Sequence, residues 1–136
     1  MNDFRKPRVI IADDERHSRV LLRAVLSAMR CEVVAEATNG IEAYELYNVH
    51  KPHLLLLDIN MPRESGEEAL RKIMTDHPGA FVIMLTAVAD LKTVEDCLSM
   101  GAANFIRKDT PIDEIKGIIK DTWQQFSRMR GRAESA

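Results

Sequence analysis

The sequence predicts an α/β fold with one parallel, doubly wound sheet of five strands, each followed by a helix. Five short apolar runs alternate with five stretches in which apolar residues recur at helical spacing, and no linker-like segment interrupts the alternation. Residues 54–57 are all leucine, which is typical of a strand buried on both faces. Because strands that alternate with helices form a parallel sheet through right-handed crossovers, we expect every strand to end at the same edge.

Length and composition fit a single globular domain. A chain of 136 residues, 46% of them hydrophobic, can bury an ordinary core without disulfides or a structural metal. The formal net charge of -2 argues against non-specific electrostatic binding to nucleic acid, and no apolar run reaches the roughly 20 residues that span a bilayer.

The polar N-terminus lacks the apolar segment of a secretory signal, so we expect a cytoplasmic protein. Cys31 and Cys97 are isolated and are assigned to packing.

The first half of the chain contains two predicted strands and two predicted helices. Residues 8–12 are apolar and end at an acidic stretch, whereas residues 32–37 have acidic ends, which favours an edge strand. Apolar residues recur at helical spacing in residues 18–28 and 41–47, and a turn is predicted at residues 38–40. Each of these strands is thus followed by a helix that can pack on the sheet.

The second half repeats this unit three times. Strands are predicted at residues 54–58, 80–85 and 104–107, and helices at residues 67–76, 90–100 and 111–126. Gly101 is the expected C-cap of the middle helix, and Thr110 resembles an N-cap followed by Pro111 at the first helical position. The charged segment 128–136 is expected to fray.

Polar side chains stand where four of these strands end. Asp13 and Asp14 follow the first strand, Asp58 ends the third, Thr86 follows the fourth and Lys108 follows the fifth. In folds of this class, ligands bind in the crevice outside the carboxyl ends of the strands. We therefore expect these side chains to meet at one edge and to form the functional site.

The residue types at this edge indicate phosphoryl transfer. Three carboxylates in one crevice repel one another, and a divalent cation such as Mg²⁺ would neutralise them through hard oxygen ligands. The hydroxyl of Thr86 and the ammonium of Lys108 can both contact the oxygens of a phosphoryl group. A nucleophile, a metal and a cationic clamp are the parts that phosphoryl transfer requires.

Several short motifs at the strand ends occur together in a fixed order. They are Asp13-Asp14, Asp58 with Met61-Pro62, Thr86-Ala87, Gly101-Ala102 and Lys108. In this combination the chain resembles the receiver domain of two-component response regulators, which has the CheY-like, flavodoxin-like fold with strand order 2-1-3-4-5. The resemblance covers residues 8–127, with residues 1–7 as an N-terminal extension and residues 128–136 as a C-terminal tail.

The resemblance implies a role for each site residue. Asp58 would accept a phosphoryl group from a sensor histidine kinase or a histidine phosphotransfer protein. Mg²⁺ would be held by Asp14, Asp58 and the backbone carbonyl of Asn60, with Asp13 acting mainly through water. Lys108 would pair with the phosphoryl group.

The resemblance also implies a switch. Thr86 would move toward the phosphoryl oxygens and Phe105 would turn inward, which shifts the population toward a second state. The surface of the fourth helix, fifth strand and fifth helix would then bind a downstream effector protein, and a homodimer formed on phosphorylation stays open. The protein would catalyse only its own phosphorylation and dephosphorylation, without direct binding to nucleic acid or membrane.

The loop after Lys108 departs from most receivers. They continue from the lysine into a proline with a cis peptide bond, whereas Asp109 follows here and the next proline is Pro111. This Lys-Asp pair, together with residues 11–14 and 34–37, resembles the receivers of helix-turn-helix transcription regulators of the nitrate-response type. The geometry of the loop therefore stays open.

Two further positions bear on the lifetime of a phosphoaspartate. Asn60 and Val88 stand two residues after Asp58 and Thr86, where the family tunes the access of hydrolytic water. The apolar Val88 either slows hydrolysis or reshapes it.

Each site residue alone has an ordinary structural explanation. Adjacent acids such as Asp13 and Asp14 are common at helix N-termini, and Asp58 alone could be an N-cap. Lys108 alone would be a surface lysine, and Phe105 alone would be a core residue. Only the joint pattern at one sheet edge favours a functional site.

Other functions with the same architecture fit less well. A phosphatase of the haloacid-dehalogenase type requires a second aspartate two residues after the first, and Asn60 stands there. A flavodoxin-like cofactor binder requires a phosphate-cradling loop after the first strand, where this chain has acids. The alternatives that remain are a receiver fragment of a DNA-binding transcriptional regulator and, with less support, an unphosphorylated pseudo-receiver.

Overall fold

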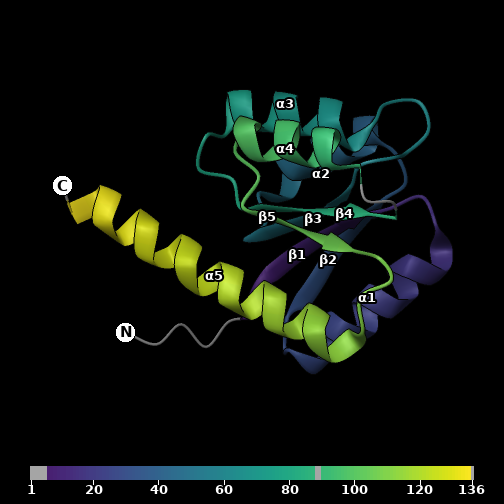
Figure 1. Cartoon of the computed structure of the whole chain (residues 1–136), viewed down its shortest axis with the longest axis horizontal. Helices are drawn as coiled ribbons and strands as arrows, with labels where there is room; N and C mark the ends of the chain where they lie inside the picture. Colours follow the sequence, from purple (N-terminus) through teal and green to yellow (C-terminus); the bar gives the residue numbers. More distant parts are fainter. Residues whose placement is uncertain (1–5, 88–89, 136) are drawn as a thin grey trace.

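The computed structural model describes residues 6–87 and 90–135, and its centre is a parallel sheet of five strands (Figure 1). The strands are β1 Arg8–Ala12, β2 Glu32–Ala37, β3 Leu54–Asp58, β4 Val82–Thr86 and β5 Asn104–Arg107. They lie in the order β2-β1-β3-β4-β5, and every neighbouring pair is parallel. The predicted fold class and strand order are confirmed, and all strands end at one edge.

Helices cover both faces of the sheet. The helices are α1 Arg16–Ala28, α2 Gly40–His50, α3 Gly66–Asp76, α4 Leu91–Met100 and α5 Ile112–Ser135. In Figure 1, α2, α3 and α4 lie above the sheet and α1 and α5 below it, and a separate apolar core fills each side. Among the described residues, no helix is long and apolar enough to cross a membrane.

The leucines of β3 show why this strand is central. All residues of β3 are buried. Leu55 and Leu57 pack in the core beneath α2, α3 and α4, whereas Leu56 packs in the core against α1 and α5. Because successive side chains of a strand point to opposite faces, an unbroken apolar run fits a strand that is covered on both sides.

β2 is the edge strand that its acidic ends predict. Its side chains are mostly half-buried, and its sheet neighbour is β1. Near its end, Glu36 accepts a hydrogen bond from Arg19 Nε at 2.9 Å and forms an ion pair with Arg23. These contacts connect the edge of the sheet to α1.

Some element boundaries differ from the sequence prediction. α1 begins at Arg16, two residues before the predicted start. β4 begins at Val82, because the N–H of Ala80 donates to the carbonyl of His77 at 2.9 Å in the preceding turn. The predicted C-cap of α4 is confirmed, since Gly101 has the left-handed φ of 118°.

α5 differs most from the prediction. It begins at Ile112, one residue later than expected, and the carbonyl of Pro111 accepts from the N–H of Ile115 at 3.0 Å. It continues to Ser135 through the segment 128–136 that we expected to fray. The last turns contain good helix formers such as arginine, methionine, alanine and glutamate, whose propensity favours continuation of the helix.

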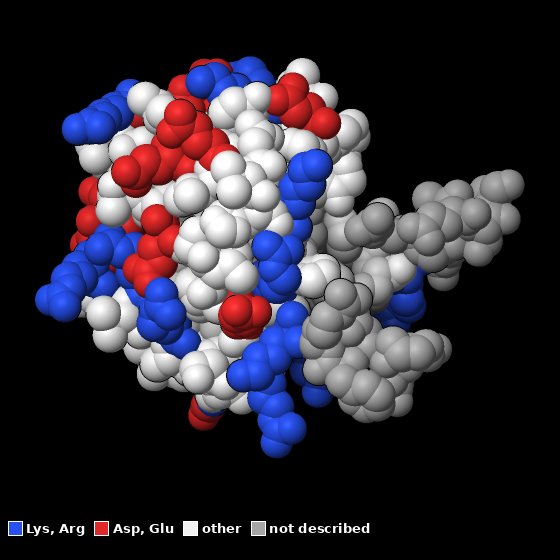
Figure 2. Space-filling model, turned by 180° about the vertical axis from the view of Figure 1, so that it is seen from behind, with Lys and Arg blue, Asp and Glu red and all other residues white. Residues whose placement is uncertain are grey.

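Charged side chains of both signs are interspersed on the face seen from behind Figure 1 (Figure 2). Acidic and basic groups alternate around uncharged areas of this face. Such a mixed face presents no field of one sign that would steer a polyanion toward it.

Candidate functional site

Three carboxylates meet at the carboxyl edge of the sheet. β1 and β3 are neighbours with Ala12 opposite Leu57, so the residues that follow them emerge side by side. Asp13 and Asp58 are buried, Asp14 is exposed, and one carboxylate oxygen of each lies within 4.8 Å of the others. The structure thus brings together the three acids that the sequence analysis selects.

Lys108 enters this cluster from the other side. Its N–H donates to the carbonyl of Thr86 at 2.8 Å, which continues the pairing of β5 with β4 and directs the residue to the site. Its Nζ donates to Asp58 Oδ2 at 2.9 Å, to Asp13 Oδ1 at 3.1 Å and to Glu15 Oε1 at 2.8 Å. One ammonium is therefore shared by three carboxylates.

The buried charges perturb one another. Burial raises the pKa of Asp58 to about 6, and the charge of Asp13 adds to this while Lys108 opposes it. Burial alone would lower the pKa of Lys108, but its hydrogen bonds to Glu15, Asp58 and Asp13 raise it above the ordinary value. Lys108 also holds the pKa of Glu15 below its usual range. The Lys108 ammonium therefore stays charged, whereas burial disfavours the charged form of the Asp58 carboxylate.

The donor set fits a divalent cation. Asp13 Oδ2 is buried and makes no hydrogen bond within the described part of the chain, although Lys108 Nζ lies 3.0 Å away. A buried carboxylate oxygen without a hydrogen bond is costly, and a hard cation would satisfy it. Together, Asp13, Asp14 and Asp58 carry three formal negative charges against the single charge of Lys108, so a further positive charge is favourable here.

Asn60 lies in the loop between β3 and α3. Its side chain is exposed, and its N–H donates to Asp58 Oδ1 at 3.2 Å. Asn60 and Lys108 therefore donate to different oxygens of the Asp58 carboxylate, Asn60 to Oδ1 and Lys108 to Oδ2, and together they orient it. Val88, the other residue assigned to water access, lies outside the described residues.

Gly66 and Gly40 allow the loop between β3 and α3 to pack tightly against neighbouring backbone, and the sequence analysis gave them no role in the site. A Cβ on Gly66 would lie 1.9 Å from the carbonyl oxygen of Asp58, and a Cβ on Gly40 would lie 2.6 Å from the carbonyl oxygen of Ser65. The N–H of Gly66 donates to the carbonyl of Ile59 at 2.8 Å. Only glycine permits this close approach of the backbone to Asp58, the last residue of β3.

Thr86 and Phe105 occupy the positions that the resemblance assigns to a switch. Thr86 is buried at the end of β4. Phe105 is half-buried on β5, opposite Met84, and packs against the core beneath α2, α3 and α4. Thr86 therefore lies on the strand next to that of Asp58, and Phe105 lies on the strand beyond it.

Glu15 is a member of the site that the sequence analysis did not select. It completes an acidic run of three residues, which was the available signal, but a carboxylate at a helix start is ordinary.

The loop after Lys108 is the segment whose geometry the sequence left open. In it, Asp109 pairs with Arg107, with oxygen–nitrogen distances of 3.1 and 2.9 Å. None of the peptide bonds in the described ranges is cis, so the Lys108–Asp109 loop is built from trans peptides.

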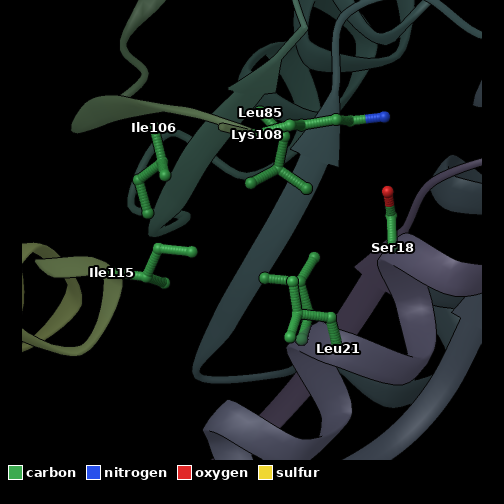
Figure 3. Close-up of a pocket in the computed structure, with 7 residues that line it drawn as sticks. Ser18, Leu21, Leu85, Ile106, Lys108 and Ile115 are labelled. Carbon is green, nitrogen blue, oxygen red and sulfur yellow. The ribbon is translucent and has the colours of Figure 1, made fainter. Parts of the chain in front are cut away.

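A small cavity lies beside the site, between α1 and the end of β5 (Figure 3). Its volume is about 20 Å³, and it is lined by Ser18, Leu21, Leu22, Leu85, Ile106, Lys108 and Ile115. A cavity of this size holds about one water molecule. It is therefore no pocket for an organic substrate, and the chemistry of the site is confined to the open carboxylate cluster.

Comparison with known proteins identifies the family of this domain. The sequence profile of the "Response regulator receiver domain" matches residues 9–120. The chain is 39% identical over 108 residues to the chemotaxis protein CheY of Listeria monocytogenes, which covers 79% of this chain and 91% of that protein. It is similar to the receiver domain of the putative response regulator NarL from Mycobacterium tuberculosis, with a TM-score of 0.79, 31% identity and coverage of 88% and 97%. It is also similar to CheY in a CheX–CheY–BeF3–Mg²⁺ complex from Borrelia burgdorferi, with a TM-score of 0.82, 29% identity and coverage of 85% and 88%.

Proposed function

This chain belongs to the response regulator receiver family, and on that premise we propose that Asp58 is the phosphoacceptor of a two-component phosphorelay. The observation that carries the proposal is the contact of Asp58 Oδ2 with Lys108 Nζ at 2.9 Å, inside a cluster with Asp13 and Asp14. A buried nucleophile, a fixed cation and further carboxylates at one sheet edge are the parts that phosphoryl transfer uses.

The transfer joins one oxygen of Asp58 to phosphorus. As that O–P bond forms, the P–N bond of a phosphohistidine on the kinase or phosphotransfer protein breaks, and the imidazole leaves with the electron pair. Lys108 donates to the phosphoryl oxygens and offsets their negative charge, and the hydroxyl of Thr86 donates to another oxygen. Because one oxygen of Asp58 becomes the bridging oxygen of an acyl phosphate, a mixed anhydride, the hydrogen bond that Lys108 now gives to Asp58 can pass to the phosphoryl group.

The acidic cluster is the proposed Mg²⁺ site. Asp14, Asp58 and the backbone carbonyl of Asn60 would hold the ion directly, and Asp13 would act mainly through water. When bound, the ion supplies positive charge that offsets the oxygens of the acceptor and of the phosphoryl group. The buried, unbonded Oδ2 of Asp13 supports this assignment. The related CheY complex from Borrelia burgdorferi contains Mg²⁺ together with BeF3.

The proposed output is a change at the surface of α4, β5 and α5. Thr86 ends β4, next to the strand of Asp58, and Phe105 lies on β5, the strand beyond it. A phosphoryl group that draws Thr86 toward itself would let Phe105 turn inward. The receiver comprises residues 8–127. Its surface of α4, β5 and α5 would then bind an effector protein or a second copy of the chain. The domain acts as a signalling switch and catalyses only its own phosphorylation and dephosphorylation.

Incubation with acetyl phosphate and Mg²⁺ tests the phosphoacceptor directly. Intact-protein mass spectrometry should show a gain of one phosphoryl group in the wild type and in Asp113→Asn, an exposed acid of α5 that serves as the control. Asp58→Asn should gain none, and removal of Mg²⁺ with a chelator should abolish the gain. Phosphorylation of Asp58→Asn at the wild-type rate would contradict the assignment.

A further inference from the structure

Lys108 has three carboxylate partners, and they use all of its donors. Its Nζ donates to Glu15 Oε1 at 2.8 Å, to Asp58 Oδ2 at 2.9 Å and to Asp13 Oδ1 at 3.1 Å. A lysine ammonium has three N–H donors and no acceptor. A phosphoryl group on Asp58 can therefore gain a full hydrogen bond from Lys108 only where one of these partners gives way.

Glu15 differs from the other two partners. Asp13 and Asp58 are buried and belong to the carboxylate cluster proposed for Mg²⁺, whereas the side chain of Glu15 is 50% exposed and lies outside that cluster. Metal and phosphoryl binding would redirect the oxygens of Asp13 and Asp58. Glu15 is not among the proposed ligands of Mg²⁺, so metal binding would not draw its carboxylate away from Lys108.

The position of Glu15 in α1 supports this distinction. Glu15 is the N-cap residue of α1, yet its side chain makes no capping hydrogen bond. The N-cap residues of α2, α3 and α4, by contrast, each accept a bond from their own helix through Asn39, Ser65 and Asp90. The carboxylate of Glu15 is instead turned to Lys108, beyond the end of β5.

The stem of Lys108 limits how far the ammonium can travel. In Figure 3, the Lys108 side chain extends along the upper rim of the small cavity, with its nitrogen above Ser18 of α1 and Leu85 near the base of its stem. The Lys108 side chain is only 14% exposed. A packed stem keeps the ammonium within reach of both Glu15 and Asp58, so a change of partner requires rotation of the head group alone.

We propose that Glu15 is a positioning residue that restrains Lys108 toward α1 in the unphosphorylated domain and so slows phosphorylation of Asp58. The inference rests on the proposed function of Asp58. Glu15 acts in two ways: it occupies one donor of Lys108, and its negative charge opposes an incoming phosphoryl group.

Two substitutions separate the contact from the charge. Glu15→Gln removes the charge, and Glu15→Asp keeps the charge but is one methylene too short for the same contact with Lys108. Aspartate is also a preferred N-cap, so this variant should fold and cap α1. With acetyl phosphate at saturating Mg²⁺, we expect both variants to be phosphorylated about two- to fivefold faster than the wild type, the range for a half-exposed ion pair.

Two controls tie the effect to Lys108. Glu68→Gln removes an exposed acid from the first turn of α3, where its partner is Arg71 at 3.5 Å, and should leave the rate unchanged. In a Lys108→Ala background, Glu15→Asp should add nothing, whereas Glu15→Gln should keep only the part of its effect that comes from the lost negative charge. A wild-type rate in Glu15→Asp, or a slower rate in Glu15→Gln, would overturn the restraint.

A second readout separates this inference from the phosphoacceptor proposal. NMR of the Lys108 ammonium group without any phosphoryl donor should show a shifted signal and greater side-chain mobility in both Glu15 variants. If the wild type takes no phosphoryl group but the signal still shifts, the proposed function fails, and only the restraint of the Lys108 ammonium by Glu15 stands. An unchanged Lys108 signal in both variants would overturn the restraint whatever the phosphorylation assay shows.

Discussion

The two ends of this sheet contain opposite kinds of residue. At the carboxyl end, the buried acids Asp13 and Asp58 share the ammonium of Lys108. At the amino end, Phe81 packs against Trp123 and Phe126, with ring centroids 5.3 and 4.5 Å apart. An apolar cavity of about 170 Å³ lies beside this aromatic cluster.

The difference separates stability from function. Buried apolar groups stabilise the fold in proportion to the area they remove from water, whereas buried charges cost stability unless they are paired. The amino end and the two cores therefore offset the cost of the charged edge. Substitutions at the amino end should lower stability with little effect on chemistry, whereas removal of a charge at the carboxyl edge should abolish chemistry without lowering stability.

Phe81→Ala should have the largest effect on stability. Phe81 is 3% exposed, and its truncation should lower the free energy of unfolding by about 3–5 kcal/mol through lost burial and a cavity. Urea denaturation measures the loss, with Val49→Ala as the control, because Val49 is 74% exposed. Under conditions where the variant stays folded, phosphorylation of Asp58 should match the wild type, and a loss of phosphorylation there would break the separation.

Gly66→Ala should damage both properties, because it places a methyl group against the backbone of Asp58. The added Cβ would lie 1.9 Å from the Asp58 carbonyl oxygen, so the loop that carries Asn60 must shift. We expect a loss of about 3 kcal/mol, at the upper end for overpacking, and at least tenfold slower phosphorylation. Gly79→Ala is the matched control, since a Cβ there meets no atom within 4 Å. Equal behaviour of the two variants would show that the loop tolerates the displacement.

Asp58→Asn should stabilise the domain in the absence of divalent cations. Burial raises the pKa of Asp58 to about 6, above its unfolded value, so the folded state disfavours the charged carboxylate. The wild type should therefore lose stability relative to the variant as pH rises from about 4 through 6, and the difference should level off at about 3 kcal/mol above that range. Thermal unfolding across this pH range, in a chelator, measures the difference. A variant that is less stable than the wild type at pH 7 would mean that the pairing with Lys108 outweighs burial.

Glu36→Gln should have the smallest effect. Hydrogen bonds and charges from Arg23 and Arg19 hold the pKa of Glu36 below its usual range. The stabilisation is present above the unfolded pKa of about 4.3 and is lost as pH falls through the lower folded value, so the variant and the wild type should converge in acid. At neutral pH and low salt we expect a loss of about 0.5–1 kcal/mol that high salt reduces, as chemical denaturation at two ionic strengths can measure.

Much of the fold follows from local patterns in the sequence. The leucines of β3 predict a strand buried on both faces, and parallel strands necessarily end at one edge, which is why Asp13, Asp58 and Lys108 could be assigned to one site. The boundaries were less predictable. The late start of β4 depends on the turn bond from Ala80 to His77, and the extension of α5 depends on weak helix propensities summed over its last turns.

The parts of the site that the sequence did not reveal depend on contacts between distant residues. Glu15 and Lys108 are 93 residues apart in the chain, and nothing local distinguishes a carboxylate that caps a helix from one that turns away. Gly66 is needed because the carbonyl of Asp58 passes beside it, which a sequence pattern does not show. Three-dimensional proximity, and not residue type, identifies both.

The most direct measurement is an NMR titration with beryllofluoride and Mg²⁺ that follows the backbone amides of the wild type and of Asp58→Asn. The account predicts Mg²⁺-dependent changes in the wild type at the strand ends around Asp13, Asp58 and Lys108 and across α4, β5 and the start of α5. The signals of Phe81 and Trp123 at the amino end should stay in place, and Asp58→Asn should show no response to beryllofluoride. The same response in Asp58→Asn, or changes centred on the aromatic cluster, would contradict the assignment of the carboxyl edge as the phosphoryl site.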